Sequence, residues 1–403
     1  MIKILYVIEP MLGIGPNMDA NLIAKKVAQK FANKINIKIV LEKDFFSKKQ
    51  SKNISWECLS PWRFDFINDK LVDLNGKELS ESDKRERAQH LIKICKNYKP
   101  DVLLLHNYMS GSKWDSIIDF EMLPLIEFAK NQNQNLKVYS YMIGMLDGFE
   151  NVSDTEAVFF LESIKKNIDK IFLRSDNLSL FIKTCPPAKK IKNYFLPIGY
   201  SGNDEFVKKI IDVADKFIVV SAGGGDIALN LFKKSIEACS LLDDYDELGK
   251  YKWIIFLGPM QEKNKKILEK YIESYKCSNK INLFVGADEE DFLSYLMYNC
   301  IISISQCGQR TFTNLEMAGV NSIVIPRESN GKEFEQLYRA LYMENIGRAK
   351  LIRERDLTPE ILIRNIKEIY KDIPKKIGIK MNGPENLIRN ILDLSVVSNI
   401  IKK

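Results

Sequence analysis

The chain has few of the residues that enzymes use most often for proton transfer and metal binding. Only two of its 403 residues are histidine, and its seven cysteines are scattered. No Cys-x-x-Cys pair occurs, so the familiar zinc and redox spacings are absent, and an odd number of thiols favours a reducing compartment. No apolar run approaches the ~18–20 residues that a membrane span needs. We therefore expect a cytoplasmic protein with no metal and no resident cofactor.

The positive charge of the chain is modest. The 60 Lys and Arg residues outnumber the 53 Asp and Glu residues, which gives a formal net charge of +7. Such a charge permits attraction to anionic nucleotides or to a phospholipid surface, but the lysines are interleaved with acids and form no nucleic-acid footprint. A solvated, lysine-rich surface explains the same composition. We expect no nucleic-acid partner, and peripheral contact with the inner membrane face stays open.

Short apolar runs alternate with longer segments of helical period, a pattern that is typical of βαβ units around parallel sheets. The chain is also longer than one hydrophobic core usually serves, so two domains are expected. The stretch 197–206 contains Pro, Gly, Ser and Asn near the midpoint and is predicted as a linker. The expected fold class is α/β, with two Rossmann-like domains whose parallel sheets face a cleft. We predict domains over 1–198 and 203–383 and a C-terminal helix over 384–403 that packs back on the first domain.

The apolar runs predict five strands in each half. They are 2–8, 36–41, 101–106, 136–142 and 170–174, then 216–221, 252–257, 281–285, 300–304 and 321–325. Helices are expected over 17–33, 80–98, 119–133 and 153–168 and after each strand of the second half. The aromatic segment 43–78 lacks a clear period, so we predict an irregular loop that covers the core, with an acceptor-site lid as the alternative.

Each half opens with a strand that runs into glycines. These are Gly13, Gly15, Gly223, Gly224 and Gly225. Glycines let a backbone approach a ligand closely, although such turns often only permit tight packing of a strand on a helix. Met18 stands where a dinucleotide fingerprint requires its third glycine, and neither loop ends in the Gly-Lys-Ser/Thr of a P-loop. An NAD enzyme and a P-loop NTPase are therefore disfavoured.

The stretch SQCGQRTFTNLEMAGV, residues 305–320, places polar residues between a buried strand and a helix. Such residues break the core pattern, which suggests that a group outside the core requires them. A strand, a glycine, hydroxyl residues and a helix, in that order, offer a phosphate a row of backbone N–H donors and a positive helix end. The sequence therefore predicts a phosphate site at this point.

Several motifs follow one another in the order seen in GT-B glycosyltransferases. They are YKPDVLLLHNYMSG (98–111), FEMLPLIEFA (120–129), SAGGGDIALN (221–230), WIIFLGPM (253–260), the 305–320 stretch, IVIPRESNGKEFEQLYRALYMENIG (323–347) and MNGPENLIRNIL (381–392). The chain most resembles the branch related to the bacterial enzyme that adds N-acetylglucosamine to the undecaprenyl-linked peptidoglycan precursor. The predicted, mostly uncharacterised members of that branch are the group it is most similar to, and the resemblance covers nearly the whole chain.

The resemblance implies a nucleotide-sugar donor, UDP-linked, on the C-terminal domain. Gly308 and Thr311 match the residues that line the diphosphate. The family's ribose-binding Glu falls six residues after the glycine, where this chain has Asn314, which can bond a hydroxyl but carries no charge. Glu316 lies two residues further on and should face away from Asn314 on a helix.

Three further residues complete the donor site that the resemblance implies. Glu335 and Gln336 match the acidic/Gln pair that contacts the donor sugar. Arg310 replaces an uncharged residue of the family. It either meets a phosphate or is an ordinary solvated arginine.

The catalytic base is where the chain departs from the family. The relatives carry His directly after the first glycine loop, and here that position is Pro16, which cannot titrate. His106 instead ends the strand DVLLLH, where the relatives have Asp, and the carboxyl ends of strands are where α/β proteins bind ligands. The two residue types could have exchanged places, with His106 as the base and Asp19 as its orienting partner. A structural strand-end histidine is the alternative, and His90, among charges on a helix, is expected at the surface.

The resemblance implies an inverting transfer, in which a deprotonated acceptor hydroxyl attacks the anomeric carbon. The acceptor, of small-molecule, glycan, peptide or lipid-linked type, is expected near the first glycine loop, including Asn17. No metal is expected, because helix N-termini serve the departing diphosphate, and the Asp-x-Asp of 243–247 follows a helix rather than a strand. The alternatives are a sugar-nucleotide epimerase or hydrolase on the same fold and a non-catalytic nucleotide-sugar-binding or partner subunit.

Overall fold

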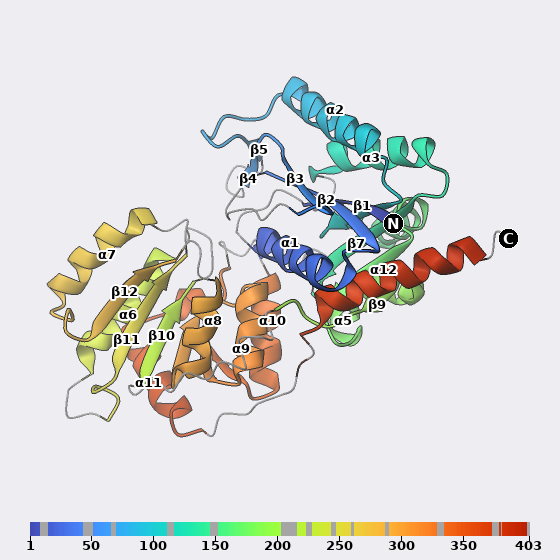
Figure 1. Cartoon of the computed structure of the whole chain (residues 1–403). Coiled ribbons are helices and arrows are strands. Elements are labelled where there is room, and N and C mark those ends of the chain that lie inside the picture. The colour runs from blue at the N-terminus through green and yellow to red at the C-terminus, as the bar shows by residue number, and fades with distance from the viewer. Residues whose placement is uncertain are drawn as a thin grey trace. The chain divides into compact units, whose positions relative to one another are not determined.

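The computed structural model divides the chain into two compact units (Figure 1). Unit 1 comprises Met1–Leu12, Pro16–Ser201 and Lys380–Lys403, and unit 2 comprises Gly13–Gly15 and Gly202–Ile379. The structure describes residues 1–8, 15–42, 51–65, 70–110, 117–145, 152–202, 216–222, 228–242, 247–258, 262–286, 290–328, 334–372, 379 and 381–400. No helix within these ranges is long and apolar enough to cross a membrane.

Unit 1 is built on a parallel sheet in the order β3-β2-β1-β6-β7-β8-β9. Its strands are β1 (Ile2–Val7), β2 (Ile35–Leu41), β3 (Ile54–Cys58), β6 (Val102–His106), β7 (Lys137–Ile143), β8 (Lys170–Arg174) and β9 (Phe195–Pro197), and a hairpin of β4 (Arg63–Asp65) and β5 (Lys70–Val72) lies apart from it. Its helices are α1 (Gly15–Lys26), α2 (Glu81–Tyr98), α3 (Asp119–Gln132), α4 (Asp154–Asn167), α5 (Ser179–Thr184) and α12 (Gly383–Ile400). A π-helical turn, Val27–Phe31, continues α1, and a 3-10 segment, Pro186–Tyr194, precedes β9.

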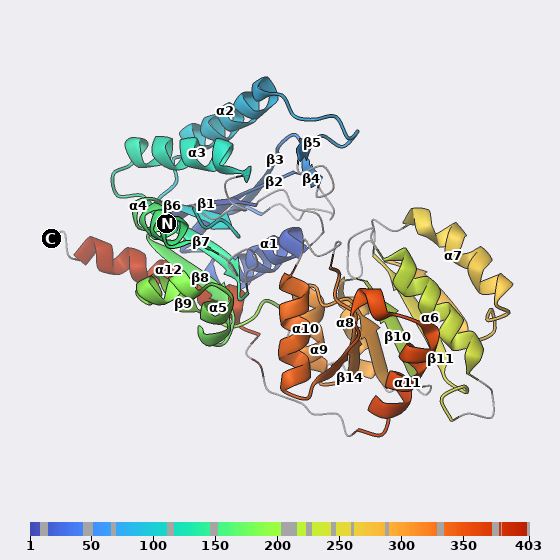
Figure 2. The same ribbon diagram turned by 180° about the vertical axis from the view of Figure 1, so that it is seen from behind.

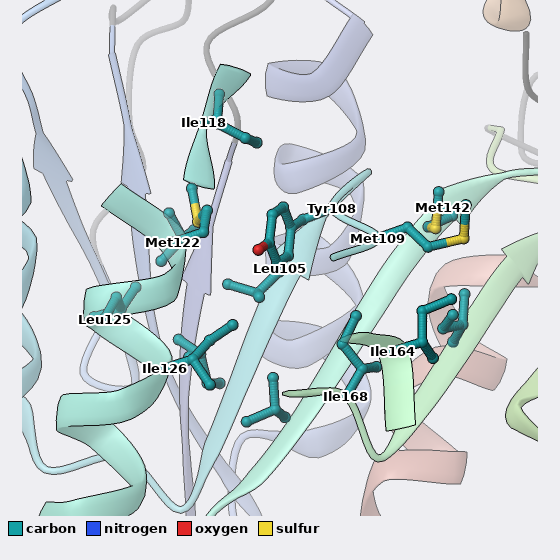
Figure 3. Packing of buried hydrophobic residues seen from close by; sticks show 14 of the residues in the cluster. Leu105, Tyr108, Met109, Ile118, Met122, Leu125, Ile126, Met142, Ile164 and Ile168 are labelled. Carbon is teal, nitrogen blue, oxygen red and sulfur yellow. The ribbon is translucent and has the colours of Figure 1, made fainter. Parts of the chain in front are cut away.

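Both faces of this sheet are buried, because alternate side chains of each strand point to opposite faces. On one face Leu103 and Leu105 pack with residues of α2, α3 and α4. Figure 3 shows this cluster, with Leu105 beside Met122 and Ile126 of α3. On the other face Ile4 and Tyr6 pack with residues of α1 and α12. A sheet covered on both sides by helices is the doubly wound arrangement that the alternating pattern predicted.

The C-terminal helix α12 is part of unit 1. Its residues Leu387, Ile388 and Ile391 are fully buried in the same cluster as β1. Asn386 Nδ2 donates to the carbonyl of Ile198 over 2.8 Å, and Gly383 N donates to the carbonyl of Tyr200 over 3.0 Å. The chain therefore returns to the first unit after completing the second.

Unit 2 has a parallel sheet in the order β12-β11-β10-β13-β14-β15. The strands are β10 (Phe217–Ser221), β11 (Lys252–Leu257), β12 (Ile281–Val285), β13 (Ile302–Ser305), β14 (Asn321–Val324) and β15 (Ala349–Leu351). The helices are α6 (Leu229–Leu241), α7 (Glu262–Ser274), α8 (Glu290–Asn299), α9 (Gln309–Ala318), α10 (Glu335–Asn345) and α11 (Pro359–Ile369), with a 3-10 turn at Glu354–Asp356. Figure 2 shows α6 and α11 beside one another, and their residues Phe232 and Ile366 share a core with Ile218 of β10.

The strand orders give each unit a switch point, where successive connections leave the sheet in opposite directions. It lies between β1 and β6 in unit 1 and between β10 and β13 in unit 2. In open α/β sheets, ligands bind outside the carboxyl ends of the strands at such points. The observed sheets confirm the predicted fold class. The prediction of an irregular segment over 43–78 was wrong for β3, which pairs with β2 along the edge of the sheet.

Unit 1 also contains a largely buried charge cluster. Arg87 of α2 pairs with Glu121 of α3 over 2.5 Å and with Glu42, just after β2, over 2.9 Å. Two carboxyl groups therefore share one guanidinium, with Arg87 and Glu121 buried and Glu42 largely so. The pKa of Glu42 is raised to about 8, chiefly by burial, which Arg87 opposes and which the nearby Glu121 reinforces. Burial also raises the pKa of Glu121.

We expect Glu42→Gln to flatten the pH dependence of stability between about pH 4.5 and 8. The folded chain holds a proton on Glu42 that the unfolded chain has released, so this group's contribution to stability is complete below pH 4.5 and is lost as the pH rises through about 8. Urea unfolding of both proteins at several pH values measures the difference. An unchanged slope in the variant would show that Glu42 is ionised in the folded chain.

Candidate functional site

The predicted phosphate site lies at the switch point of unit 2. Gly308 is the N-cap of α9 and follows β13 by three residues. No side chain caps this helix, and no acid stands in its first turn. A helix that begins in this way presents backbone N–H groups and a positive dipole end to whatever lies beyond the strands.

The glycine itself is not required by the packing of the described residues. The backbone of Gly308 has φ −60° and ψ 155°, which any residue can adopt. A Cβ placed on it would meet no described atom within 4 Å. The missing side chain therefore leaves open space in front of the helix, as the approach of a ligand to the backbone would require.

Two buried serines lie below this point. Ser221 ends β10, Ser305 ends β13, and the two pair in register. Both are fully buried, and their hydroxyls have no hydrogen-bond partner among the described residues. Buried hydroxyls are normally satisfied. Each of these two strands, which precede glycine-containing stretches of unit 2, therefore ends in a buried hydroxyl group that the described residues leave unsatisfied.

The α9 residues predicted to meet the nucleotide follow Gly308 in the first two turns. Thr311 and Asn314 are both buried, with 4% of each exposed, and Arg310 is half-buried. Thr311 and Asn314 are three positions apart and share one face of the helix. The described structure therefore brings Gly308, Thr311 and Asn314 together at one end of α9.

Glu316 occupies a different environment from Asn314. Its carboxylate lies 3.6 Å from Nε of Arg348, and Arg348 Nη2 donates to its backbone carbonyl over 3.3 Å. Burial raises the pKa of Glu316, and Arg348 opposes this. The acid thus forms a buried ion pair within unit 2 and differs in its surroundings from Asn314.

The predicted sugar-contact pair begins α10, and a residue that the sequence did not single out holds it. Arg339 is fully buried. Its Nε donates to the carbonyl of Cys307 over 2.8 Å, its Nη1 to Oε1 of Gln309 over 3.2 Å, and its Nη2 to Oε1 of Glu335. Gln336 Oε1 accepts a hydrogen bond from the backbone N–H of Arg327 over 3.1 Å. One arginine therefore joins the Gly308 turn to Glu335.

At the switch point of unit 1, the structure brings His106 and Asp19 together. His106 Nε2 lies 3.6 Å from Oδ2 of Asp19, which comes from α1. Both residues are buried, with 1% and 5% exposed. The ring of His106 lies between those of Tyr6 and Tyr141, at centroid distances of 6.2 Å and 6.1 Å. Two residues that are 87 positions apart in the chain thus lie close together in a well-packed setting.

Arg174, the last residue of β8, is the part of this cluster that the sequence reading missed. It forms an ion pair with Asp19, and its Nη2 donates to Oδ1 of Asn107 over 2.6 Å. The guanidinium also lies 5.1 Å from the centre of the Tyr141 ring. Asn107 has a left-handed φ of 51°, and its Oδ1 also accepts from the backbone N–H of Ile143. Oδ2 of Asp19 therefore has both a buried cation and the imidazole as neighbours.

The remaining predicted residues are only partly described. Gly15 begins α1, and Asn17 lies in its first turn with an Oδ1 that is buried and has no hydrogen-bond partner among the described residues. The predicted residues Gly13, Gly223, Gly224 and Gly225 and the Asp-x-Asp pair Asp244 and Asp246 lie outside the described residues. Within the ranges that the structure describes, no group of three or more His, Cys, Asp or Glu side chains is placed to hold a metal ion.

Comparisons with known proteins agree with this arrangement. Residues 261–389 match the C-terminal domain of glycosyltransferase family 28. A UDP-N-acetylglucosamine--N-acetylmuramyl-(pentapeptide) pyrophosphoryl-undecaprenol N-acetylglucosamine transferase of Alkaliphilus oremlandii is 26% identical over 208 residues, which cover 49% of this chain and 53% of the relative. The enzyme of the same name from Thermotoga maritima is 39% identical over 71 residues, 18% of this chain and 21% of the relative. The chain thus matches about half the length of the first relative and about a fifth of the length of the second.

Solved structures are similar over the whole chain. The alignment with the crystal structure of Acinetobacter baumannii MurG covers 98% of this chain and 100% of the MurG chain, with a TM-score of 0.55 and 12% sequence identity. The UDP-GlcNAc 2-epimerase of Neisseria meningitidis covers 97% and 100%, with a TM-score of 0.57 and 15% identity. At these identities the likeness concerns the fold. Two parallel-sheet units, each with its own switch point, define a GT-B fold.

Among proteins with this fold, the sequence comparisons relate the chain to one family. The chain is related to the family 28 glycosyltransferases, whose C-terminal domain it carries over residues 261–389. This finding confirms the resemblance that the ordered motifs indicated.

Proposed function

We propose that the protein is a glycosyltransferase that moves a sugar from a UDP-linked donor to an acceptor hydroxyl with inversion. The observation that carries the proposal is the uncapped N-terminus of α9 behind Gly308, at the switch point of a domain related to family 28. The donor's diphosphate lies against the N–H groups of this turn, and its ribose and sugar lie toward Asn314 and Glu335. The relatives are named as transferases that use UDP-N-acetylglucosamine as donor and a pyrophosphoryl-undecaprenol compound as acceptor.

The reaction requires the protein to stabilise negative charge on the leaving diphosphate and to remove one proton from the acceptor hydroxyl. As the bond from the anomeric carbon to the diphosphate breaks, negative charge grows on the leaving oxygen. Oriented backbone N–H groups and the dipole of α9 stabilise that charge without reorganising. The acceptor hydroxyl loses its proton to His106, and the sugar forms its new bond to that oxygen from the opposite face.

Asp19 has a positioning role in this proposal. Its carboxylate is 3.6 Å from the imidazole and already paired with Arg174. It therefore orients the ring and stabilises the imidazolium that forms, in the way that a carboxylate supports a histidine base elsewhere. The acceptor is placed on unit 1, near Asn17 and His106. A lipid-linked acceptor would bring the protein to the cytoplasmic face of a membrane.

The direct test is turnover by the purified chain with a panel of UDP-sugars. Thermal shift identifies the donor, because a ligand that binds the folded state raises the unfolding temperature by mass action. Incubation of that donor with candidate acceptors, followed by mass spectrometry, distinguishes a transferred sugar from a hydrolysed or epimerised one. Binding without any turnover would instead identify a nucleotide-sugar-binding subunit, and an epimerised donor would support the epimerase alternative.

We expect Gly308→Ala to weaken UDP binding while leaving the fold intact. Because the new Cβ meets no described atom, the free energy of unfolding should change by no more than about 0.5 kcal/mol. The methyl group would stand where the phosphate approaches, and loss of one hydrogen bond to a charged group costs about 1.5–3 kcal/mol, roughly 10- to 150-fold in affinity. Titration calorimetry with UDP and urea unfolding measure the two quantities.

Gly286→Ala is the matched control in the same unit. A Cβ at Gly286 would overlap the ring of Phe256, so this variant should lower stability. It shows that the unfolding assay detects a glycine that packing requires. Unchanged UDP affinity in the Gly308 variant would remove the turn from the donor site.

We expect transfer to continue in excess EDTA. In this proposal, backbone N–H groups and a helix dipole stabilise the charge of the diphosphate, so no divalent ion has to bridge the phosphates. Initial rates with and without EDTA test this. A loss of activity that Mg²⁺ or Mn²⁺ restores would assign a metal role to acids such as Asp244 and Asp246.

A further inference from the structure

Arg339, a buried residue of α10, contacts three parts of the predicted donor site: the residue before Gly308, the first turn of α9 and the first turn of α10. Arg339 has no exposed surface, and its three nitrogens reach acceptors from three places: the carbonyl of Cys307, the amide of Gln309 and the carboxylate of Glu335. A guanidinium is planar and carries its donors in a fixed fork. It therefore fixes the relative positions of these three acceptors more strictly than a flexible amine would.

The contact with Cys307 sets the direction of a backbone donor. The peptide bond between Cys307 and Gly308 is trans, and in a trans peptide the carbonyl and the following N–H point in opposite directions. Because Arg339 Nε holds the Cys307 carbonyl at 2.8 Å, the N–H of Gly308 is turned away from Arg339. Gly308 is also where a Cβ would meet no described atom. The arginine thus fixes the direction of one N–H of the turn, which points away from the Arg339 side chain.

The contact with Glu335 links the same turn to the start of α10. The ion pair joins residues four positions apart on the helix, and 26% of the Glu335 side chain is exposed. A buried guanidinium needs a counter-charge, and Glu335 supplies it. Arg339 and Glu335 are therefore one unit: the acid cannot reorient without leaving the cation unpaired.

We propose that Arg339 is a positioning residue of the donor site, which sets the direction of the Gly308 N–H and couples it to Glu335. This inference rests on the proposed function, because it assumes that the turn binds the donor's diphosphate. If the inference is right, the contribution of the phosphates to donor affinity depends on Arg339. The contribution of the nucleoside to donor affinity does not depend on Arg339.

The experiment compares UDP with uridine in Arg339→Lys. Lysine keeps the charge near Glu335 but cannot hold three acceptors in one plane. The dissociation constant for UDP should rise about tenfold or more, as for the loss of one well-placed hydrogen bond to a charged group. The constant for uridine, which has no phosphate, should stay within about threefold. A merely structural role would weaken both ligands alike and leave their ratio unchanged.

Arg348→Lys is the matched control. Arg348 is also buried in unit 2 and also bonds a carboxylate and a carbonyl, but both belong to Glu316 near the other end of α9. Its ratio of uridine to UDP dissociation constants should equal that of the wild type. An equal fall of the ratio in both variants would overturn the proposal, since any disturbed arginine would then produce it.

Gln309→Ala keeps the proposal testable if Arg339→Lys fails to fold. It removes one acceptor of Arg339, and we expect a smaller loss, about threefold, for UDP alone. An unchanged UDP affinity in this variant, or in a folded Arg339→Lys, would overturn the positioning role while leaving the donor site in place. If the wild type binds neither UDP nor a panel of GDP, ADP and dTDP, the proposed function itself fails, and the inference fails with it.

Discussion

Replacing His106 by Gln should lower sugar transfer by ~10²–10⁴-fold, the usual contribution of a general base. Gln keeps a polar side chain of similar size at the end of β6 but cannot accept a proton near neutral pH. UDP affinity should remain within about twofold of wild type, because the proposed donor contacts are all in unit 2. Initial rates at saturating donor, with calorimetric titration of UDP, separate the two effects.

The chain offers a simple control, because it has only one other histidine. His90 lies exposed on α2, and His90→Gln should leave the rate unchanged. Asp19→Asn should reduce turnover less than His106→Gln does, since an orienting carboxylate assists the proton transfer without receiving the proton. Full turnover in a folded His106 variant would show that the histidine packs between Tyr6 and Tyr141 for structural reasons only. Asp19 or a group on the acceptor would then be the next candidate for the base.

Arg174→Met should lower the free energy of unfolding by about 3–5 kcal/mol, the usual result of removing one partner of a buried ion pair. The change takes away the cation beside Asp19, of which only 5% is exposed, and the donor to Asn107. Urea unfolding measures the difference. The effect should be the largest of any single substitution predicted for stability in this protein.

A double variant makes the cause visible. Adding Asp19→Asn to Arg174→Met removes the stranded negative charge, so the double variant should recover much of the lost stability. Arg355→Met is the exposed control: Arg355 lies 3.9 Å from Asp356 with 73% of its side chain exposed, and it should change stability by less than about 0.5 kcal/mol. Losses that simply add in the double variant would mean that the Arg174–Asp19 pair is not the source of the effect.

Much of the fold follows from hydrophobic period. The runs at 2–8 and 101–106 became β1 and β6 because parallel strands buried on both faces are nearly continuous in apolar residues. The edge strand β3 was missed for the opposite reason. Its sequence ISWEC is only partly buried and contains a charge, so it has neither a continuous run nor a strict alternation.

The side chains that organise the two switch points were harder to predict. The pairing of Asp19 with His106 came from the resemblance: the relatives carry His after the first glycine loop and Asp at the end of the strand that His106 ends here, which suggested that the two residue types had exchanged places. Arg174 and Arg339 gave no such signal. A charged residue within a helical or strand pattern is normally assigned to the surface, and only the three-dimensional arrangement shows which acids and carbonyls surround it.

The return of α12 to unit 1 affects the order in which the protein can mature during synthesis. Nearly all of unit 2 is the continuous stretch Gly202–Ile379, whereas the face of unit 1 that contains Ile4 and Tyr6 is covered in part by a helix translated after that stretch. While the ribosome translates unit 2, that apolar face has no α12 to cover it. The newly made first domain is therefore the part of the chain on which chaperones would act, and the second domain can fold before the first is complete.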